Sequence, residues 1–234
     1  MPLNEIPLAE RLRPTTLDEF MGQNKILGAG SLLRRSLETD SIPSMIFWGP
    51  PGCGKTSLAN VIKNQSSKKF VSLSAVSSGV KDVKTVLAEA KEPNLLNPHG
   101  TILFIDEIHR FNKSQQDALL GAVEDGTVTL IGATTENPGF EVNSALLSRC
   151  QLILFAPLQE DELEKLLFNA LHNDPRGLCR KDVELTKEVA KKLIALADGD
   201  ARFLLNQLEW IVASLGDKKV IDEKVKAVAK SLDL

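Results

Sequence analysis

Residues 49–56 have types and spacing that suit the binding of phosphate groups. Their sequence, GPPGCGKT, fits the pattern G-x-x-x-x-G-K-[ST] and stands between an apolar run and a helix-like stretch. The glycines let backbone N–H groups turn toward phosphate oxygens, and the following helix presents its N-terminus to the same charge. Lys55 is expected to reach the β- and γ-phosphates of ATP, and the Thr56 hydroxyl to ligate Mg²⁺. The residues predicted to hold the nucleotide in this loop are Gly49, Pro50, Pro51, Gly52, Cys53, Gly54, Lys55, Thr56 and Ser57.

Two acidic residues follow the apolar stretch TILFI, and they suit the hydrolysis of a phosphate bond. In a parallel sheet the carboxyl ends of strands share one edge, so Asp106 is expected beside Mg²⁺. Glu107 would then orient or deprotonate the attacking water. A kinase needs room for an acceptor where Glu107 would hold water, so hydrolysis is favoured over transfer. The alternative is a strand that simply ends in solvated carboxylates. One histidine, His109, beside an acid is a weak zinc ligand set, so we assign it no metal.

The composition is that of an ordinary folded protein of 234 residues with 43% hydrophobic and 25% charged residues. Its three cysteines lack paired spacing, which favours a reducing compartment. No apolar run approaches the roughly 18 residues of a membrane span, and the N-terminus lacks the apolar core of a secretion signal, so we expect an intracellular protein. The net charge of −3 gives no general bias toward nucleic acid, so any DNA contact would come from a local patch.

Five short apolar or β-branched runs alternate with helix-length segments, which predicts an α/β fold with a five-stranded parallel sheet. These runs are residues 45–48, 70–74, 101–105, 127–132 and 151–155. After Pro157 the spacing becomes helical, with helices expected around 163–171 and 189–197, and others opened by Asp200 and Asp222. Gly199 is expected to end the second of these helices, and residues 93–100 are expected to form a loop. We therefore predict a nucleotide-binding domain over 1–156 and a small helical domain over 157–234.

Several strings together resemble those of the AAA+ ATPases of the clamp-loader clade. These are GPPGCGKT, FIDE, IGATTENP, SALLSRC and GDARFLLNQLE. More narrowly, IDEIHRFNKSQQDALL and GATTENPGFEVNSALLSRC resemble the replication-associated recombination ATPases, named RarA or MgsA in bacteria and Werner-helicase-interacting protein in eukaryotes. The resemblance covers nearly the whole chain. It implies a P-loop AAA+ core followed by a helical lid, with ATP and Mg²⁺ bound at the core.

The resemblance also implies roles for residues whose spacing alone predicts none. Thr134 would be the sensor that bonds the nucleophilic water or the γ-phosphate, with its neighbour Thr135 as the alternative. Arg149 would be an arginine finger that reaches the ATP of a neighbouring subunit, and Arg202 a second sensor at the start of the third lid helix. Without the resemblance, both arginines would be read as exposed surface cations. The residues expected to border the adenine are Arg11, Arg13, Pro14, Met21, Gly22 and Gln23.

The family's activity implies DNA as a partner, either single-stranded, at duplex ends or at forks, together with replication and repair proteins. Lys81 and Lys84 open a helix that faces DNA in clamp loaders, but surface lysines have the same appearance. Ser74 occupies the place of a polar residue that restrains the catalytic glutamate in clamp loaders. The location would be the cytoplasm or nucleoid in a bacterium, or the nucleus in a eukaryote.

Relatives continue into a C-terminal helical module that drives tetramer formation, whereas this sequence stops at Leu234. We therefore expect an ATPase core that could be monomeric, although the intact protein would be a homo-oligomer. Three other functions remain open. One is a nucleotide-gated scaffold that binds ATP to recruit partners with little turnover, another is a clamp-loader subunit proper, and the last is a Holliday-junction branch migration motor.

Overall fold

The computed structural model describes residues 6–92, 99–180, 182–214 and 220–221. The chain divides into two compact units, Pro14–Ala156 and a second that combines Met1–Arg13 with Pro157–Leu234. The division after Ala156 lies where the sequence pattern changes. The N-terminal residues up to Arg13, however, group with the helical unit, and not with the α/β unit in which the sequence analysis placed them.

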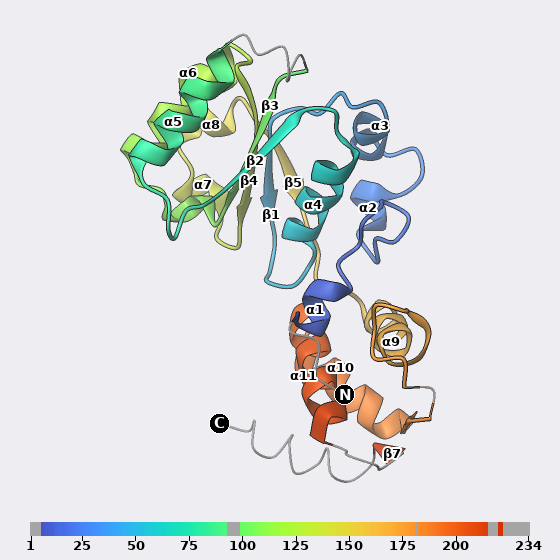
Figure 1. The fold of residues 1–234 in the computed structure, drawn as a ribbon. Helices are drawn as coiled ribbons and strands as arrows, with labels where there is room; N and C mark the ends of the chain where they lie inside the picture. The colour runs from blue at the N-terminus through green and yellow to red at the C-terminus, as the bar shows by residue number, and fades with distance from the viewer. Residues whose placement is uncertain (1–5, 93–98, 181, 215–219, 222–234) are drawn as a thin grey trace. The chain divides into compact units, whose positions relative to one another are not determined.

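The larger unit contains a five-stranded sheet in which every neighbouring pair of strands is parallel, with the order β2-β3-β4-β1-β5 (Figure 1). The predicted α/β fold with a parallel sheet is confirmed. Each predicted run forms a strand with ends shifted by no more than a few residues. The strands are β1 (Met45–Trp48), β2 (Lys69–Ser74), β3 (Thr101–Asp106), β4 (Val128–Thr134) and β5 (Gln151–Leu154).

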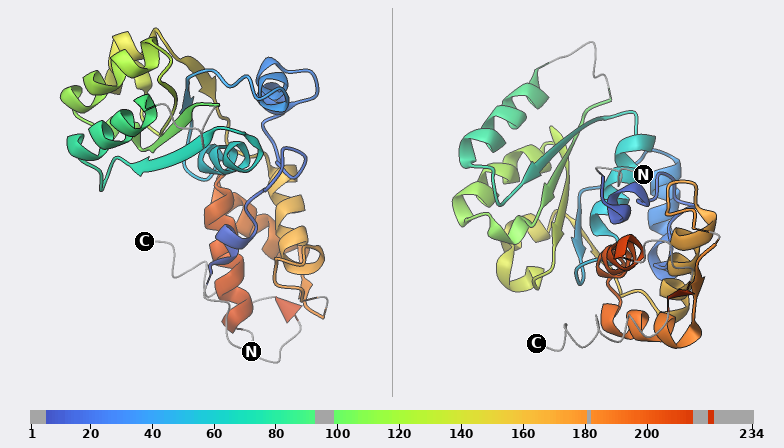
Figure 2. Two further views of the ribbon diagram at one scale, coloured as in Figure 1. Left: turned by 45° about the horizontal axis from the view of Figure 1, so that its top comes forward. Right: turned by 60° about the horizontal axis from the view of Figure 1, so that its bottom comes forward.

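Helices cover both faces of this sheet, as Figures 1 and 2 show. On one face lie α5 (Val80–Lys91), α6 (Lys113–Glu124), α7 (Pro138–Glu141) and α8 (Ser144–Leu147), and on the other lie α2 (Asn24–Leu27), α3 (Leu32–Glu38) and α4 (Lys55–Gln65). The predicted loop at 93–100 lies outside the described residues, apart from His99 and Gly100. No helix in the described part of the chain is long and apolar enough to cross a membrane.

Burial on both faces explains why the strands read as continuous apolar runs. On β3, Leu103 and Ile105 belong to the core that α5 and α6 cover, together with Ile46 of β1. Phe47 is fully buried and its ring centroid lies 5.3 Å from that of Phe155. Burying each such side chain contributes about 1.5–3 kcal/mol to folding, so this core fixes the strand ends that carry the polar residues.

The smaller unit is mainly helical. Its elements are α1 (Leu8–Arg11), α9 (Glu160–Phe168), the π-helical turn η2 (Asn169–Asn173), β6 (Glu184–Leu185), α10 (Lys187–Ala197), α11 (Ala201–Ser214) and β7 (Val220–Ile221). The predicted third helix, α11, directly follows Asp200, whose Oδ1 accepts the N–H of Phe203 at 2.9 Å. α10 ends before Gly199, as predicted. The short parallel pair of β6 and β7 was not predicted, and the helix expected after Asp222 lies outside the described residues.

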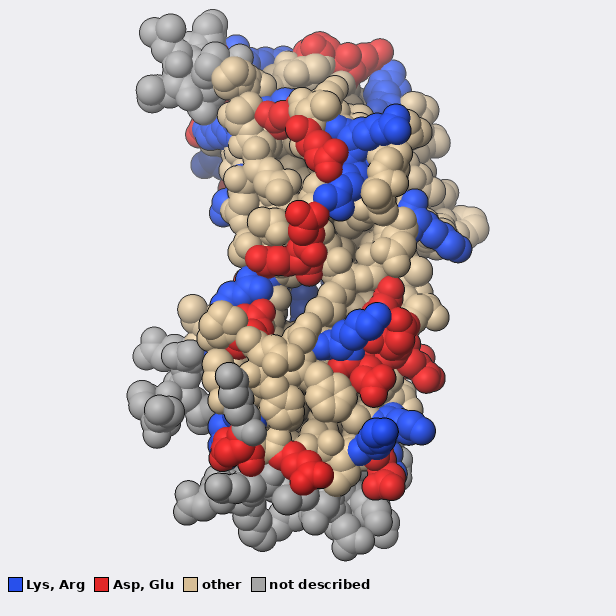
Figure 3. All heavy atoms as spheres, turned by 90° about the vertical axis from the view of Figure 1, so that its right-hand side faces the viewer, with Lys and Arg blue, Asp and Glu red and all other residues tan. Residues whose placement is uncertain are grey.

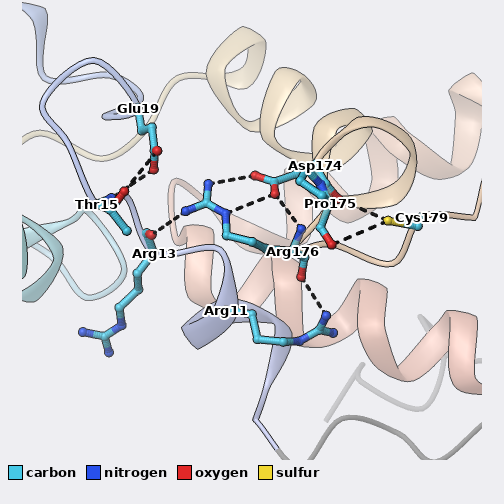
Figure 4. Close-up of polar contacts among 8 residues, drawn as sticks. All are labelled: Arg11, Arg13, Thr15, Glu19, Asp174, Pro175, Arg176 and Cys179. Atoms are coloured by element: carbon cyan, nitrogen blue, oxygen red, sulfur yellow. Dashed lines mark hydrogen bonds and ion pairs between the residues drawn. The ribbon is translucent and has the colours of Figure 1, made fainter.

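Polar contacts tie the N-terminal segment into the helical unit (Figure 4). The N–H of Leu8 donates to Glu209 at 2.9 Å, and the Arg11 guanidinium forms an ion pair with Glu209 at 3.3 Å. Arg11 also donates to the carbonyls of Arg176 and Gly177, at 2.7 and 3.0 Å. Leu8 itself is fully buried. These contacts explain why the segment groups with α11 rather than with the sheet.

The cysteines provide a test of this packing. Cys53 is 1% exposed, and burial raises the pKa of the Cys150 thiol to about 11, whereas Cys179 is exposed. At pH 8 only about one Cys150 thiol in a thousand is ionised, and the thiolate is the reactive form. We expect a thiol-specific disulfide reagent to modify Cys179 rapidly and the other two only after denaturation. Rapid reaction of all three thiols in the native chain would contradict the fold described above.

Candidate nucleotide-binding and hydrolysis site

The loop between β1 and α4 has the backbone of a phosphate cradle. Gly52 and Gly54 have φ values of 66° and 106°, in the left-handed region that favours glycine. A Cβ atom at Gly54 would lie 2.7 Å from the ring of Phe20, so the close approach of these residues requires glycine. α4 begins at Lys55, directly after this turn. The predicted order of strand, glycine-rich loop and helix is present, with the helix N-terminus at the loop.

The Lys55 side chain lies across the loop that precedes it. Only 7% of Lys55 is exposed, and its Nζ donates to the carbonyl oxygens of Gly49 and Pro50, each at 2.7 Å. The Sγ of Cys53 lies 3.8 Å from the same nitrogen. A buried ammonium group needs an anion or several acceptors to offset the loss of water. The two carbonyls therefore hold the Lys55 ammonium group against the loop.

Asp106 and Thr56 are the residues available for a cation at this edge of the sheet. Asp106 ends β3, and its Oδ1 accepts the N–H of Glu107 at 3.1 Å. Thr56 is the second residue of α4, which follows β1. In the part of the chain that the structure describes, no group of three or more His, Cys, Asp or Glu residues could hold a metal. Mg²⁺ in nucleotide sites takes one or two protein oxygens and completes its shell with phosphates and water, so the oxygen donors of this pair fit Mg²⁺.

A three-residue chain of contacts joins the acidic strand end to the neighbouring strand. The Nε2 of His109 lies 3.3 Å from Oε2 of Glu107, and its Nδ1 lies 2.9 Å from Oγ1 of Thr134. Thr134 ends β4 and is completely buried. The structure thus connects two predicted site residues, Glu107 and Thr134, through a histidine to which the sequence analysis gave no function.

Of the two predicted arginines, Arg149 lies in the same unit as this constellation but apart from it. Arg149 stands two residues before β5, whose first residue pairs with Met45, the first residue of β1. It therefore lies at the amino edge of the sheet, whereas the phosphate loop follows the carboxyl end of β1. The side chain is exposed and forms an ion pair with Glu124 at 3.1 Å. Arg202 is exposed in the first turn of α11, in the helical unit.

Comparison with known proteins assigns the fold to one group. Residues 45–158 match the family described as "ATPase family associated with various cellular activities (AAA)". Replication-associated recombination protein A of Coxiella burnetii is 50% identical over 206 residues, which cover 88% of this chain and 46% of that protein. The chain belongs to the AAA ATPases. The predicted resemblance to the replication-associated recombination group is confirmed.

Two further comparisons support this assignment of the AAA chain. The ATPase WRNIP1 of Dictyostelium discoideum is 43% identical over 220 residues, covering 94% of this chain and 25% of that protein. The solved structure of the Thermotoga maritima RuvB Holliday junction branch migration motor has a TM-score of 0.73 and 27% identity, and the match covers 95% of this chain and 73% of that one. The chain spans about half the length of the replication-associated recombination proteins that it matches.

Gln23, which the sequence analysis placed beside the adenine, supports the phosphate loop of this AAA core. Its Nε2 donates to the carbonyls of Cys53 and Ala156, at 3.2 and 2.7 Å, and its Oε1 accepts the N–H of Ala156 at 3.1 Å. The side chain is buried. One amide thus links the loop to the segment after β5. The motif pattern gave no signal for this contact, because the three residues are far apart in the sequence.

Replacing Gln23 by alanine tests this link. The change leaves buried backbone groups of Cys53 and Ala156 without their partner, which costs about 1–3 kcal/mol of the free energy of unfolding. Chemical denaturation of the 234-residue chain measures the loss. Gln151→Ala, at an exposed position on β5, serves as the control and is expected to change the stability little. Equal stability of the two variants would contradict the supporting role of Gln23.

Proposed function

We propose that this AAA protein hydrolyses ATP and acts with DNA in replication-fork maintenance, recombination and DNA damage tolerance. The observation that carries the proposal is the convergence of three segments at one edge of the sheet. The phosphate loop follows β1, the acid pair ends β3, and Thr134 ends β4, with Trp48 of β1 paired to Thr134. The names of the relatives support the wider role in replication and recombination.

In the proposed reaction each residue acts on a different part of the triphosphate. Lys55 exchanges its carbonyl partners for β- and γ-phosphate oxygens, while the N–H groups at the start of α4 bind the same phosphates. Mg²⁺, held by Thr56 and Asp106, would neutralise charge between these phosphates. Glu107 orients the water and accepts its proton, and Thr134 donates a hydrogen bond to that water or to the γ-phosphate.

The position of Arg149 supports action between subunits. The strand β1 separates the amino edge, where Arg149 lies, from the phosphate loop by about 10 Å at 3.3 Å per residue. An arginine there points to the ATP of a neighbouring copy, which requires a homo-oligomer such as the tetramer that the family implies. An arginine supplied in this way makes hydrolysis depend on assembly. Arg202 is proposed as the second sensor in the helical lid, and the adenine pocket as Arg13, Pro14, Met21, Gly22 and the backbone of Gln23.

We propose DNA and repair proteins as the partners, because the chain resembles the clamp-loader clade. Lys81 and Lys84 are exposed on α5 and are candidates for contact with DNA phosphates. Over the face shown in Figure 3, Lys and Arg side chains are interspersed with Asp and Glu. A contact with DNA on that face would therefore involve only a small part of the surface. These roles place the protein inside the cell. A scaffold that binds ATP without turnover is the alternative, and it predicts no need for Glu107.

Glu107→Gln tests the hydrolysis directly. The amide keeps the size of the side chain but cannot take a proton, so we expect ATP turnover to fall about 10²- to 10⁴-fold while ATP affinity is unchanged. Lys55→Ala is the matched comparison. It removes the positive charge proposed to meet the phosphates, so it is expected to weaken the binding of ATP. Fluorescent-nucleotide titration and a phosphate-release assay on the intact protein separate the two effects. Full turnover in Glu107→Gln would favour the scaffold.

Arg149→Ala tests the contact between subunits. Wild-type turnover per subunit is expected to rise with protein concentration, with and without single-stranded or forked DNA, whereas the variant stays about 10³- to 10⁵-fold lower. Mixing Arg149→Ala with Glu107→Gln should restore turnover, because one copy keeps the glutamate and the other keeps the arginine. If the mixture is as inactive as its components, while each still binds ATP, Arg149 does not act across an interface.

A further inference from the structure

We propose that His109 is a positioning residue that fixes the Glu107 carboxylate relative to Thr134, and so couples the base to the sensor. This inference rests on the proposed hydrolysis at Glu107. His109 lies on the 3₁₀ turn η1 (Ile108–Arg110), directly after the acid pair. Its two ring nitrogens both face groups assigned to the reaction, at 3.3 Å for Glu107 and 2.9 Å for Thr134.

The backbone of this turn is held independently of the histidine. Glu107 has φ 56° and ψ 44°, a left-handed conformation that is costly for a residue with a side chain. Ile108 is fully buried and anchors the turn against β4. A Cβ atom at Gly132 would lie 2.9 Å from Ile108, so the turn approaches the strand as closely as glycine allows. The N–H of Arg110 donates to the Glu107 carbonyl at 2.9 Å and closes the turn.

The Glu107 side chain, in contrast, has one polar contact in the described part of the chain, which is with His109. The carboxylate side chain is 33% exposed, while that of His109 is 12% exposed. A partly exposed glutamate has several rotamers, and only some of them direct the carboxylate toward Thr134 and the attacking water of the proposed reaction. The histidine selects among them.

Few hydrogen atoms are available to form hydrogen bonds between Glu107, His109 and Thr134. An ionised carboxylate can only accept, so a hydrogen bond across the 3.3 Å contact with Glu107 requires a hydrogen on Nε2 of His109. The N–H of Glu136 donates to Thr134 Oγ1 at 3.0 Å, and the hydroxyl hydrogen of Thr134 has two acceptors within reach. These are His109 Nδ1 at 2.9 Å, in the tautomer that carries its hydrogen on Nε2, and the carbonyl of Glu136 at 3.2 Å. The orientation of the Thr134 hydroxyl is therefore coupled to the ring that holds Glu107.

A set of substitutions separates positioning from simple packing. His109→Ala is expected to lower kcat about 10- to 100-fold in the intact protein while KM for ATP stays near the wild-type value. His109→Gln places an amide near the position of Nε2 and should recover much of kcat, whereas His109→Asn, with its amide near Nδ1, should not. His99→Ala, at an exposed histidine, is the control. Wild-type kcat in His109→Ala, or equal recovery by both amides, would overturn the inference.

The double variant tests whether His109 acts through Glu107. If it does, adding His109→Ala to Glu107→Gln should cause no further loss, because the side chain that it positions is already inactive. A full additional 10- to 100-fold loss would assign the histidine to another step and overturn the inference. Failure of the proposed function is recognised separately, since Glu107→Gln alone would then keep its turnover.

Discussion

The parallel pairing of β3, β4 and β1 is the constraint on which the candidate site depends. Because the three strands run in one direction, the loops that follow them open at the same edge of the sheet. The phosphate loop, the acid pair and Thr134 come from separate segments and meet only through this pairing. A shift of β4 by one residue would turn Thr134 to the opposite face and remove its contact with His109. The register of the strands therefore decides which side chains meet at the candidate site.

The sequence predicted the parts of this arrangement that leave a local pattern. Each strand is buried on both faces and so reads as an apolar run, and the phosphate loop needs glycine and lysine at fixed spacing. The order β2-β3-β4-β1-β5 leaves no such pattern, because pairing depends on how the connections cross the sheet. The contact between His109 and Thr134 spans 25 residues of sequence and two elements, so no motif contains it. The strands β6 and β7 have two residues each, too few for a period.

Two residues expected to border the adenine make side-chain contacts that their positions in the sequence did not suggest. Gln23 was expected at the adenine, yet its side chain bonds the backbone of Cys53 and Ala156. Arg11 was expected there too, yet it donates to carbonyls of residues 176 and 177 in the helical unit. Both are long polar side chains that satisfy buried or partly buried backbone groups. Sequence spacing can identify a polar residue near a site, but it does not show which backbone atoms form hydrogen bonds with that residue.

The grouping of Met1–Arg13 with Pro157–Leu234 means that the backbone passes between the two units twice. A proline follows each crossing, Pro14 at the first and Pro157 at the second, and its ring restricts φ there. Two backbone connections therefore join the units, where a single linker would supply one. Ala156, the last residue before the second crossing, is bound by the same Gln23 amide that holds the phosphate loop. The Gln23 side chain therefore joins the end of the α/β unit at the second crossing directly to the loop between β1 and α4.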